Sequence, residues 1–303
     1  RIYARPRLKS PVMLAAWPGM GNVSLGAIDY LRRKLRAAPF AEIDAGKLTP
    51  PDAVLVHDGV ASLAEPPKNL FYYKEKPPLV IFEGEGQIAG AAGVQFMDTL
   101  LELARELRVQ RIYTGAAFPL PMSYQEPSAV FGVANSEQLR DSLSDFGVKT
   151  MEGGQISGLN GLLLGYAAVK DIEGICLLAT MPLYAVNLPN PRASKALLEV
   201  LVRALGVEVD MTELDLASED MAKKMAVIEE KIREVFPALD TEEKPAGLEE
   251  ERIPNYIMEK IERLFQEARA DREKAVILKE ELDRWHLYEL YEDRFLDLFK
   301  KDH

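Results

Sequence analysis

The feature that most constrains this chain is a regular alternation, between residues 11 and 210, of short apolar runs with longer segments of helical spacing. The runs are four to six residues long and apolar on both faces, which is typical of strands buried between two layers of helices. The predicted strands are Val12–Ala16, Ala53–His57, Leu79–Phe82, Arg111–Gly115 and Ile175–Thr180. The predicted helices are Val23–Arg36, Gly93–Leu107, Ser136–Phe146, Gly158–Val169 and Arg192–Leu205. This alternation predicts an α/β fold, a layered sheet flanked by helices.

The last third of the chain differs in both pattern and charge. Residues 1–210 carry 21 basic and 22 acidic residues, whereas residues 211–303 carry 16 and 26, so most of the net charge of −11 lies there. Ser218 is a good N-cap for a helix whose apolar residues recur at heptad-like spacing. These apolar residues are Met221, Met225, Ile228, Ile232 and Val235. We therefore expect an α/β core domain over residues 1–215 and an acidic α-helical extension over residues 216–303.

The extension contains a second long helical segment. Pro237 ends the first helix, and Pro237–Ile253 is an acidic connection. From Asn255 to His303 there is neither Gly nor Pro, and a continuous helix over Asn255–Lys300 would be about 70 Å long. The extension is thus expected to form either a helical hairpin or a projecting arm, and an apolar stripe on an arm needs a partner.

Composition excludes several classes of protein. An acidic chain is a poor match for nucleic acid, which needs a basic face. Cys176 is the only cysteine, which excludes an intrachain disulfide and favours a reducing, cytoplasmic location. With the three histidines far apart (His57, His286 and His303), no zinc site is expected. No apolar run reaches the ~18 residues of a membrane span. We expect no cofactor, metal, nucleic acid or membrane partner.

A Gly-rich turn follows the first strand. Gly19 and Gly21 would let the backbone approach a ligand at the start of a helix, where an anion is favoured. The spacing Gly19-x-Gly21-x-x-Ser24 is close to the dinucleotide fingerprint, with Glu42 and Asp44 about 20 residues further on. The alternative is a tight strand-to-helix turn that requires glycine and binds nothing.

Two carboxylates follow the Leu79–Phe82 strand. If the backbone stays extended, Glu83 and Glu85 point to the same side, where they could share a proton or hold a divalent cation. Carboxyl ends of strands are also where open α/β sheets bind ligands. The alternatives are a solvated loop and a contact with a neighbouring subunit.

A third Gly-rich segment runs from Gly153 to Gly165. Gly153 and Gly154 could form an anion-binding nest, while Gly158, Gly161 and Gly165 have the spacing that lets another helix or strand pack closely. Packing is favoured, because the Gly158–Val169 segment is almost wholly apolar and is expected to be buried.

Complete catalytic constellations are missing from the sequence. There is no Gly-x-Ser-x-Gly elbow, and the best acid/base pair, His57-Asp58, is typical of a structural strand end. We assign no catalytic residue. The candidate ligand-binding residues are Gly19, Gly21, Glu83, Glu85, Gly153 and Gly154.

At these Gly-rich segments the sequence resembles the PAC2 family, the bacterial and archaeal relatives of proteasome assembly chaperone 2. The matching segments are Pro18–Val23, Glu83–Gln87, Gly153–Leu164, Leu177–Thr180 and Asn190–Ala193. The resemblance implies a core similar to purine nucleoside phosphorylases and related hydrolases. It also implies homo-oligomers, trimers among them, with helical C-terminal extensions, and in some members a hydrophobic-Tyr-any tail that docks on the proteasome. This chain has Lys301-Asp302-His303 there instead, while Leu290-Tyr291-Glu292 fits the pattern internally.

The sequence favours a protein without enzymatic activity, an assembly-chaperone-like or scaffold protein. It would form a homo-oligomer, with a trimer favoured, and would bind a protein client through residues 216–303. The alternative is a small-molecule-binding enzyme, similar to nucleoside or amide hydrolases or phosphorylases, with its site at the Gly-rich strand ends.

Overall fold

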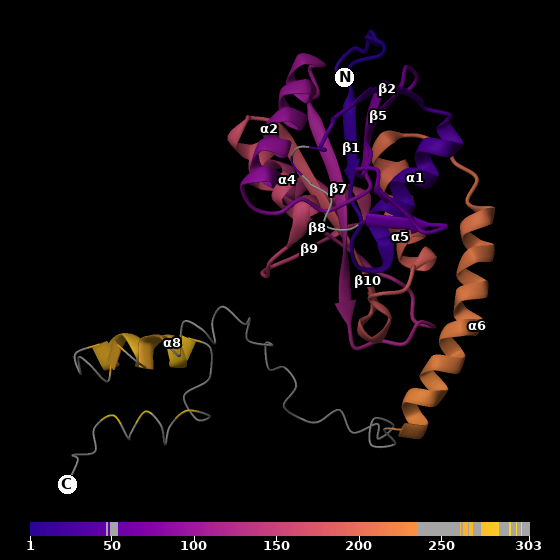
Figure 1. The fold of residues 1–303 in the computed structure, drawn as a ribbon. Coiled ribbons are helices and arrows are strands. Elements are labelled where there is room, and N and C mark those ends of the chain that lie inside the picture. The colour runs from indigo at the N-terminus through magenta and orange to yellow at the C-terminus, as the bar shows by residue number, and fades with distance from the viewer. Residues whose placement is uncertain are drawn as a thin grey trace. The chain divides into compact units, whose positions relative to one another are not determined.

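The computed structural model describes residues 1–46, 48, 54–235, 261, 263–265, 267–268, 274–284, 291, 295 and 298 (Figure 1). The chain divides into two compact units, Arg1–Ile232 and Arg233–His303. Among the described residues, no helix is long and apolar enough to cross a membrane.

The first unit is built on one mixed sheet of eight strands. In spatial order the strands are β2 (Ala38–Glu42), β5 (Asn69–Lys74), β6 (Leu79–Gly84), β1 (Val12–Ala16), β7 (Arg111–Leu120), β10 (Glu173–Pro182), β8 (Val130–Ala134) and β9 (Lys149–Thr150). Strands β6, β1, β7 and β10 are parallel, and β5 and β8 run antiparallel beside them. The four central strands include four of the five strands that the apolar runs predicted. The buried Cys176 on β10 is a core residue, as expected.

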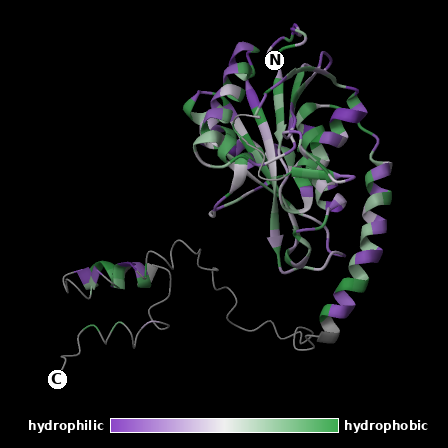
Figure 2. Cartoon of the chain, viewed as in Figure 1, coloured by the Kyte–Doolittle hydropathy of each residue, from purple (hydrophilic) through white to green (hydrophobic). Residues whose placement is uncertain are grey.

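Helices cover both faces of this sheet. α1 (Val23–Leu35) and α5 (Pro191–Leu205) lie on one face, and α2 (Gly90–Glu106) and α4 (Gly158–Val169) lie on the other (Figure 1). Alternate residues of β1 enter two separate cores, with Leu14 on the α1 side and Met13 on the α2 side. Figure 2 shows hydrophobic colouring along the central strands. The expected layered α/β fold is confirmed.

The chain leaves adjacent strands in opposite directions. After β1 it enters α1 on one face, and after β6 it enters α2 on the other. The carboxyl ends of these two parallel strands therefore flank a crevice, which is the usual ligand position in an open α/β sheet. The turn at Pro18–Asn22 and the Glu83–Gln87 segment both begin there.

One predicted strand is not part of the eight-stranded sheet. Ala53–His57 was expected inside the sheet, but Val54–His57 (β3) pairs only with Val60–Leu63 (β4) in a separate hairpin, and all of its residues are exposed. The cause is the turn: Asp58 and Gly59 have φ of 49° and 76°, the conformation of a tight two-residue hairpin loop. A local apolar pattern does not distinguish such a hairpin from a buried strand.

Helix α4 was expected to be buried, and this is wrong for one of its faces. Leu162 is 50% exposed and Val169 is 77% exposed, although Leu159 and Leu163 are buried. The reason is that α4 lies on the outside of the helix layer, so the sheet covers only one of its faces. The segment predicted as a helix over Ser136–Phe146 consists of α3 (Glu137–Asp141) and a following 3₁₀ turn, with Ser136 as its N-cap.

Helix α6 (Thr212–Val235) begins before Ser218, the residue that the sequence predicts as its N-cap. Ser218 is not its N-cap; its hydroxyl is buried inside the helix and donates to Leu214 O. Met225 is 1% exposed and packs against Tyr124 and Ala185 of the core. The boundary expected between residues 215 and 216 therefore falls within α6, which packs on the first unit.

The second unit contains α8 (Ala275–Arg284) and an apolar cluster of its own. The buried members of the cluster are Ile261, Leu264, Phe265, Ala268, Ala275, Leu278, Leu282 and Phe295. The connection Pro237–Ile253, both His286 and His303, and the tail Lys301-Asp302-His303 lie outside the described residues.

Candidate functional site

The turn after β1 is fixed by its own backbone. Gly21 has φ +62°, and its N–H donates to Val186 O at 2.8 Å while its carbonyl accepts from Asn190 N at 2.9 Å. An added Cβ at Gly21 would lie 2.9 Å from Met181 Sδ, so a side chain has neither the conformation nor the space there. The glycine is required to join the loop before α5 to the end of β1.

Two side-chain amides, one buried (Asn160) and one exposed (Gln87), hold the strand ends together. Asn160, on the first turn of α4, accepts from Trp17 N at 3.0 Å and donates from Nδ2 to Trp17 O at 3.1 Å. Gln87 donates to Pro18 O at 2.6 Å and accepts from Leu159 N at 2.9 Å. Together these amides tie the end of β1, the segment after β6 and the start of α4 into one unit.

Glu83, on β6, is paired with α1. Arg32 Nε lies 2.8 Å from Glu83 Oε1 and 2.9 Å from Oε2, and the same guanidinium also contacts Asp29. Its Cζ lies 4.5 Å from the ring centroid of Tyr72, a cation–π distance. Burial raises the pKa of Glu83 from 4.5 to about 6, against the lowering effect of Arg32.

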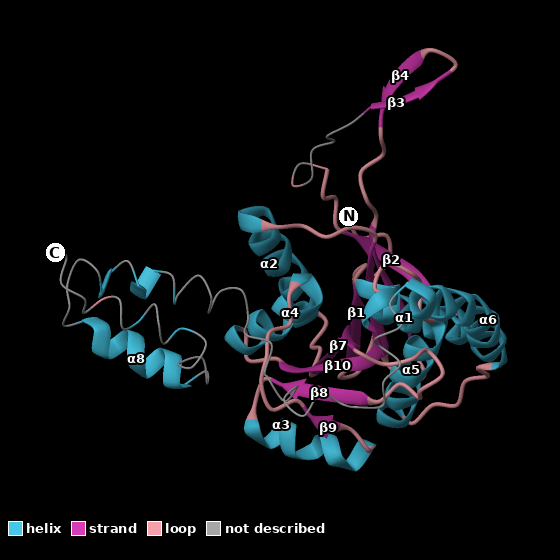
Figure 3. Ribbon diagram, turned by 90° about the horizontal axis from the view of Figure 1, so that it is seen from below, coloured by secondary structure: helices cyan, strands magenta, loops and turns pink. Residues whose placement is uncertain are grey.

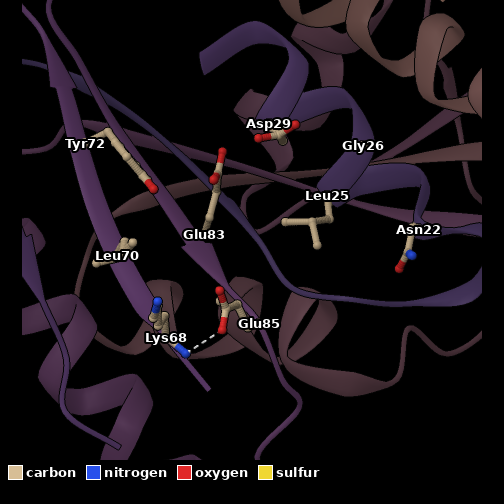
Figure 4. Close-up of a pocket in the computed structure, with 10 residues that line it drawn as sticks. Asn22, Leu25, Gly26, Asp29, Lys68, Leu70, Tyr72, Glu83 and Glu85 are labelled. Carbon is tan, nitrogen blue, oxygen red and sulfur yellow. Dashed lines mark hydrogen bonds between the residues drawn. The ribbon is translucent and has the colours of Figure 1, made fainter. Parts of the chain in front are cut away.

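Glu83 and Glu85 line the same cavity, of about 310 Å³ (Figure 4). Glu85 is exposed and accepts from the backbone N–H of Lys68 at 2.9 Å. The remaining walls come from α1, β5 and β6: Asn22, Leu25, Gly26, Asp29, Lys68, Leu70, Tyr72 and Gly84. Three carboxylates line this hollow, but Arg32 contacts two of them, Asp29 and Glu83, so the chemistry available is binding of an amine or proton transfer by Glu83.

The four glycines among the candidate ligand-binding residues do not line the Glu83 cavity. Gly19 and Gly21 line a second hollow of about 260 Å³ together with the loop at Val186–Pro189. Gly153 and Gly154 are exposed, and neither lines any of the four hollows around the Pro18–Asn22 turn. The structure therefore brings Glu83 and Glu85 together, places the turn glycines beside them, and leaves Gly153 and Gly154 apart.

Two further candidate groups lie away from the crevice. Glu42 and Asp44, the acids at dinucleotide-like spacing, are paired with Arg1 at 3.3 and 3.8 Å beside the edge strand β2. His57 and Asp58 contact each other at 3.1 Å at the tip of the β3–β4 hairpin, both at least 90% exposed. Neither pair lines any of the four hollows around the Pro18–Asn22 turn. Among the described residues, no His, Cys, Asp and Glu side chains form a metal-binding group.

Sequence reasoning missed the residues that organise this region. Asn160 had a visible signal, since a single amide in the otherwise apolar Gly158–Val169 segment needs a buried partner. Gln87 lies in the Glu83–Gln87 segment, but nothing in its spacing indicated that it holds the backbone. Arg32 and Asp29 had no distinguishing signal, because charged residues on the polar side of a helix are normally solvated.

The burial of Glu83 predicts a pH dependence of stability. Its pKa is raised in the folded state, so the fold binds more protons than the unfolded chain between pH 4.5 and 6. The free energy of unfolding should therefore fall as the pH rises through this window, by about 2 kcal/mol for this group. Relative to Glu83→Gln, the wild type should lose this amount between pH 4 and 7 in urea unfolding.

A second non-titrating variant, Glu83→Met, serves as the control for that measurement. It should give the same pH-dependent difference from wild type, although its absolute stability will differ. A wild-type-minus-variant difference that stays constant across pH would contradict the assignment of a raised pKa to Glu83.

The fold and this crevice define a class: an α/β protein with a doubly covered mixed sheet and a Gly-rich turn at the point where the chain direction switches. The family model for the PAC2 family matches residues 13–229. The chain belongs to the PAC2 family. This confirms the family resemblance predicted from the Gly-rich segments.

Individual relatives agree with this assignment. An uncharacterized protein of Methanocaldococcus jannaschii is 27% identical over 230 residues, covering 75% of this chain and 84% of the relative. PbaB of Pyrococcus furiosus, an archaeal proteasome activator, is 27% identical, with a TM-score of 0.65 over 76% of this chain and 97% of PbaB. A proteasome-assembly chaperone homologue of Mycobacterium tuberculosis is 24% identical, with a TM-score of 0.60 over 71% and 94%, and shares the fold.

Proposed function

We propose that this chain is a non-enzymatic assembly-chaperone-like or scaffold protein of the cytoplasm. It forms a homo-oligomer, with a trimer favoured, and captures a protein client. The observation that supports this most is that the polar side chains at the strand ends are paired with other groups of the fold. Asn160 and Gln87 hydrogen-bond the backbone, and Glu83 is held by Arg32, so these groups serve the fold first.

The proposed client is a proteasome subunit. PbaB, which is 27% identical to this chain, is described as an archaeal proteasome activator, and its whole length is nearly covered. In this chain the client would bind the acidic helical extension. Residues 212–232 belong to the first compact unit, so the binding part is assigned to the residues beyond α6.

The test is a truncation that keeps α6 and removes residues 236–303. Glu229, on α6, accepts hydrogen bonds from Ser123 and from Tyr124 N, at 3.0 and 2.8 Å, so a cut at residue 215 would remove core contacts. The truncated protein should keep the wild-type number of subunits per oligomer and the thermal unfolding midpoint of the first unit. Its affinity for purified archaeal proteasome subunits, measured by surface plasmon resonance, should fall more than about 10-fold. Unchanged affinity, or an unfolded core, would contradict the proposal.

A specific observation supports the alternative, a small-molecule-binding enzyme with a phosphorylase-like or hydrolase-like core. The Glu83 cavity has the volume of a small ligand site, and a carboxylate with a pKa of about 6 can exchange protons near neutral pH. Native mass spectra of the purified protein test this. A metabolite-sized extra mass, lost on denaturation and absent from Glu83→Gln, would favour the alternative; its absence from the wild type would oppose it.

A further inference from the structure

The β3–β4 hairpin is an exposed apolar element whose strands, within the described part of the chain, pair only with each other. Its five large apolar side chains are between 55% and 70% exposed, and Figure 3 shows it projecting away from the other labelled elements. A two-stranded hairpin alone in water is at best marginally stable. Contiguous apolar surface of this kind usually marks an interaction site.

One face of the hairpin is wholly apolar. The strand register places Val54 opposite Leu63 and Val56 opposite Ala61, and these four side chains share a face. The charged or ionisable groups of the ten-residue hairpin are confined to its tip, at His57 and Asp58. A complementary surface must therefore be apolar and uncharged.

The same chain exposes such a surface on α4. None of the 12 residues of α4 is charged, although 28% of the chain is. Leu162, Gly165 and Val169 recur at helical spacing on its exposed side, and an added Cβ at Gly165 would meet nothing within 4 Å. Val94 of α2 is also 42% exposed. The open position at Gly165 leaves room for a strand to approach the helix backbone.

We propose that the hairpin is an assembly arm whose apolar face docks on the exposed face of α4 in a second copy of this chain. The proposal rests on the homo-oligomer of the proposed function and names the contact that builds it. Within one copy the hairpin and α4 are both exposed, so they do not cover each other. The match of two uncharged, apolar surfaces on one acidic chain selects a second copy as the occupant.

The buried area supports a contact that is used twice by each copy. The docking face holds three large apolar side chains and Ala61, and burying them removes roughly 200–400 Å² from water, below the ~800 Å² per partner of a stable interface. A copy that both offers its hairpin and receives another on α4 buries roughly 400–800 Å², which approaches that size. Such a head-to-tail contact joins different surfaces, and it closes into a ring when the rotation between copies permits.

The test uses one charged substitution on each surface. Leu63→Glu on the hairpin and Leu162→Glu on α4 should each weaken self-association more than about 30-fold, measured by native mass spectrometry and light scattering after size exclusion. Ser62→Glu, on the other face of the same strand, is the matched control and should assemble as wild type does. Circular dichroism confirms that each variant is folded.

Mixing the two variants gives the sharper result. In a 1:1 mixture the intact hairpin of the Leu162→Glu protein can dock on the intact α4 of the Leu63→Glu protein, and no other contact remains. The mixture should form heterodimers and nothing larger, and these should be weaker than the wild-type assembly because each contains a single contact. If both variants assemble like wild type, this interface is wrong and the homo-oligomer stands. A monomeric wild type would overturn this inference and the homo-oligomer together.

Discussion

Replacing Gly84 by alanine is expected to destabilise the first unit by about 3 kcal/mol, because the added methyl group has no space. A Cβ at this position would lie 2.5 Å from Trp17 Cδ1 and 3.0 Å from Asn69 Oδ1. Real Cβ atoms do not approach other atoms this closely, so either β6 or Trp17 must move.

Trp17 cannot move cheaply. It is fully buried, and its ring centroid lies 4.9 Å from that of Phe82 and 6.3 Å from that of Phe96. Close-packed rings transmit the displacement through the core on the α2 side of the sheet.

The midpoint of thermal unfolding, measured by circular dichroism, should therefore fall by about 6–12 °C for the Gly84→Ala protein. The matched control is Gly153→Ala, where an added Cβ meets nothing within 4 Å. Its midpoint should change by less than about 2 °C. Equal shifts in the two proteins would contradict the packing of Trp17 against Gly84. Retained oligomer mass and client affinity in Gly153→Ala would also count against a ligand role for the Gly153–Gly154 pair.

Replacing Asn160 by leucine should cost about 4 kcal/mol, although the two side chains have the same number and branching of non-hydrogen atoms. The amide is 5% exposed and satisfies both the N–H and the carbonyl of Trp17. Leucine leaves both backbone groups without these partners, and an unsatisfied buried polar group costs about 1–3 kcal/mol.

The measurement is again thermal unfolding, with an expected decrease of about 8–16 °C in the midpoint. Asn187→Leu, a change of the same chemistry at an exposed position, is the control and should have little effect. An Asn160→Leu protein as stable as the control would mean that water or another group satisfies Trp17. The hydrogen bonds between Asn160 and Trp17 would then contribute little to stability.

The sequence by itself determined the layered architecture. Val12–Ala16 is apolar at every position, and a strand covered on both faces suits that pattern, so β1 was predicted as part of an α/β sheet flanked by helices. The Gly-x-Gly turn after it was predicted as a strand-to-helix connection, because glycine alone adopts positive φ readily. The family followed from the order and spacing of the Gly-rich segments.

Only the tertiary structure decided which apolar segments are covered and which polar groups meet. The Ala53–His57 run has the same local pattern as a buried strand, yet it lies in an exposed hairpin. Asn160 and Trp17 are 143 residues apart in sequence, and Glu83 and Arg32 are 51 apart. Burial and pairing are properties of the assembled layers, because they depend on which distant segment closes over a residue. Local spacing specifies the strands and helices but not their neighbours.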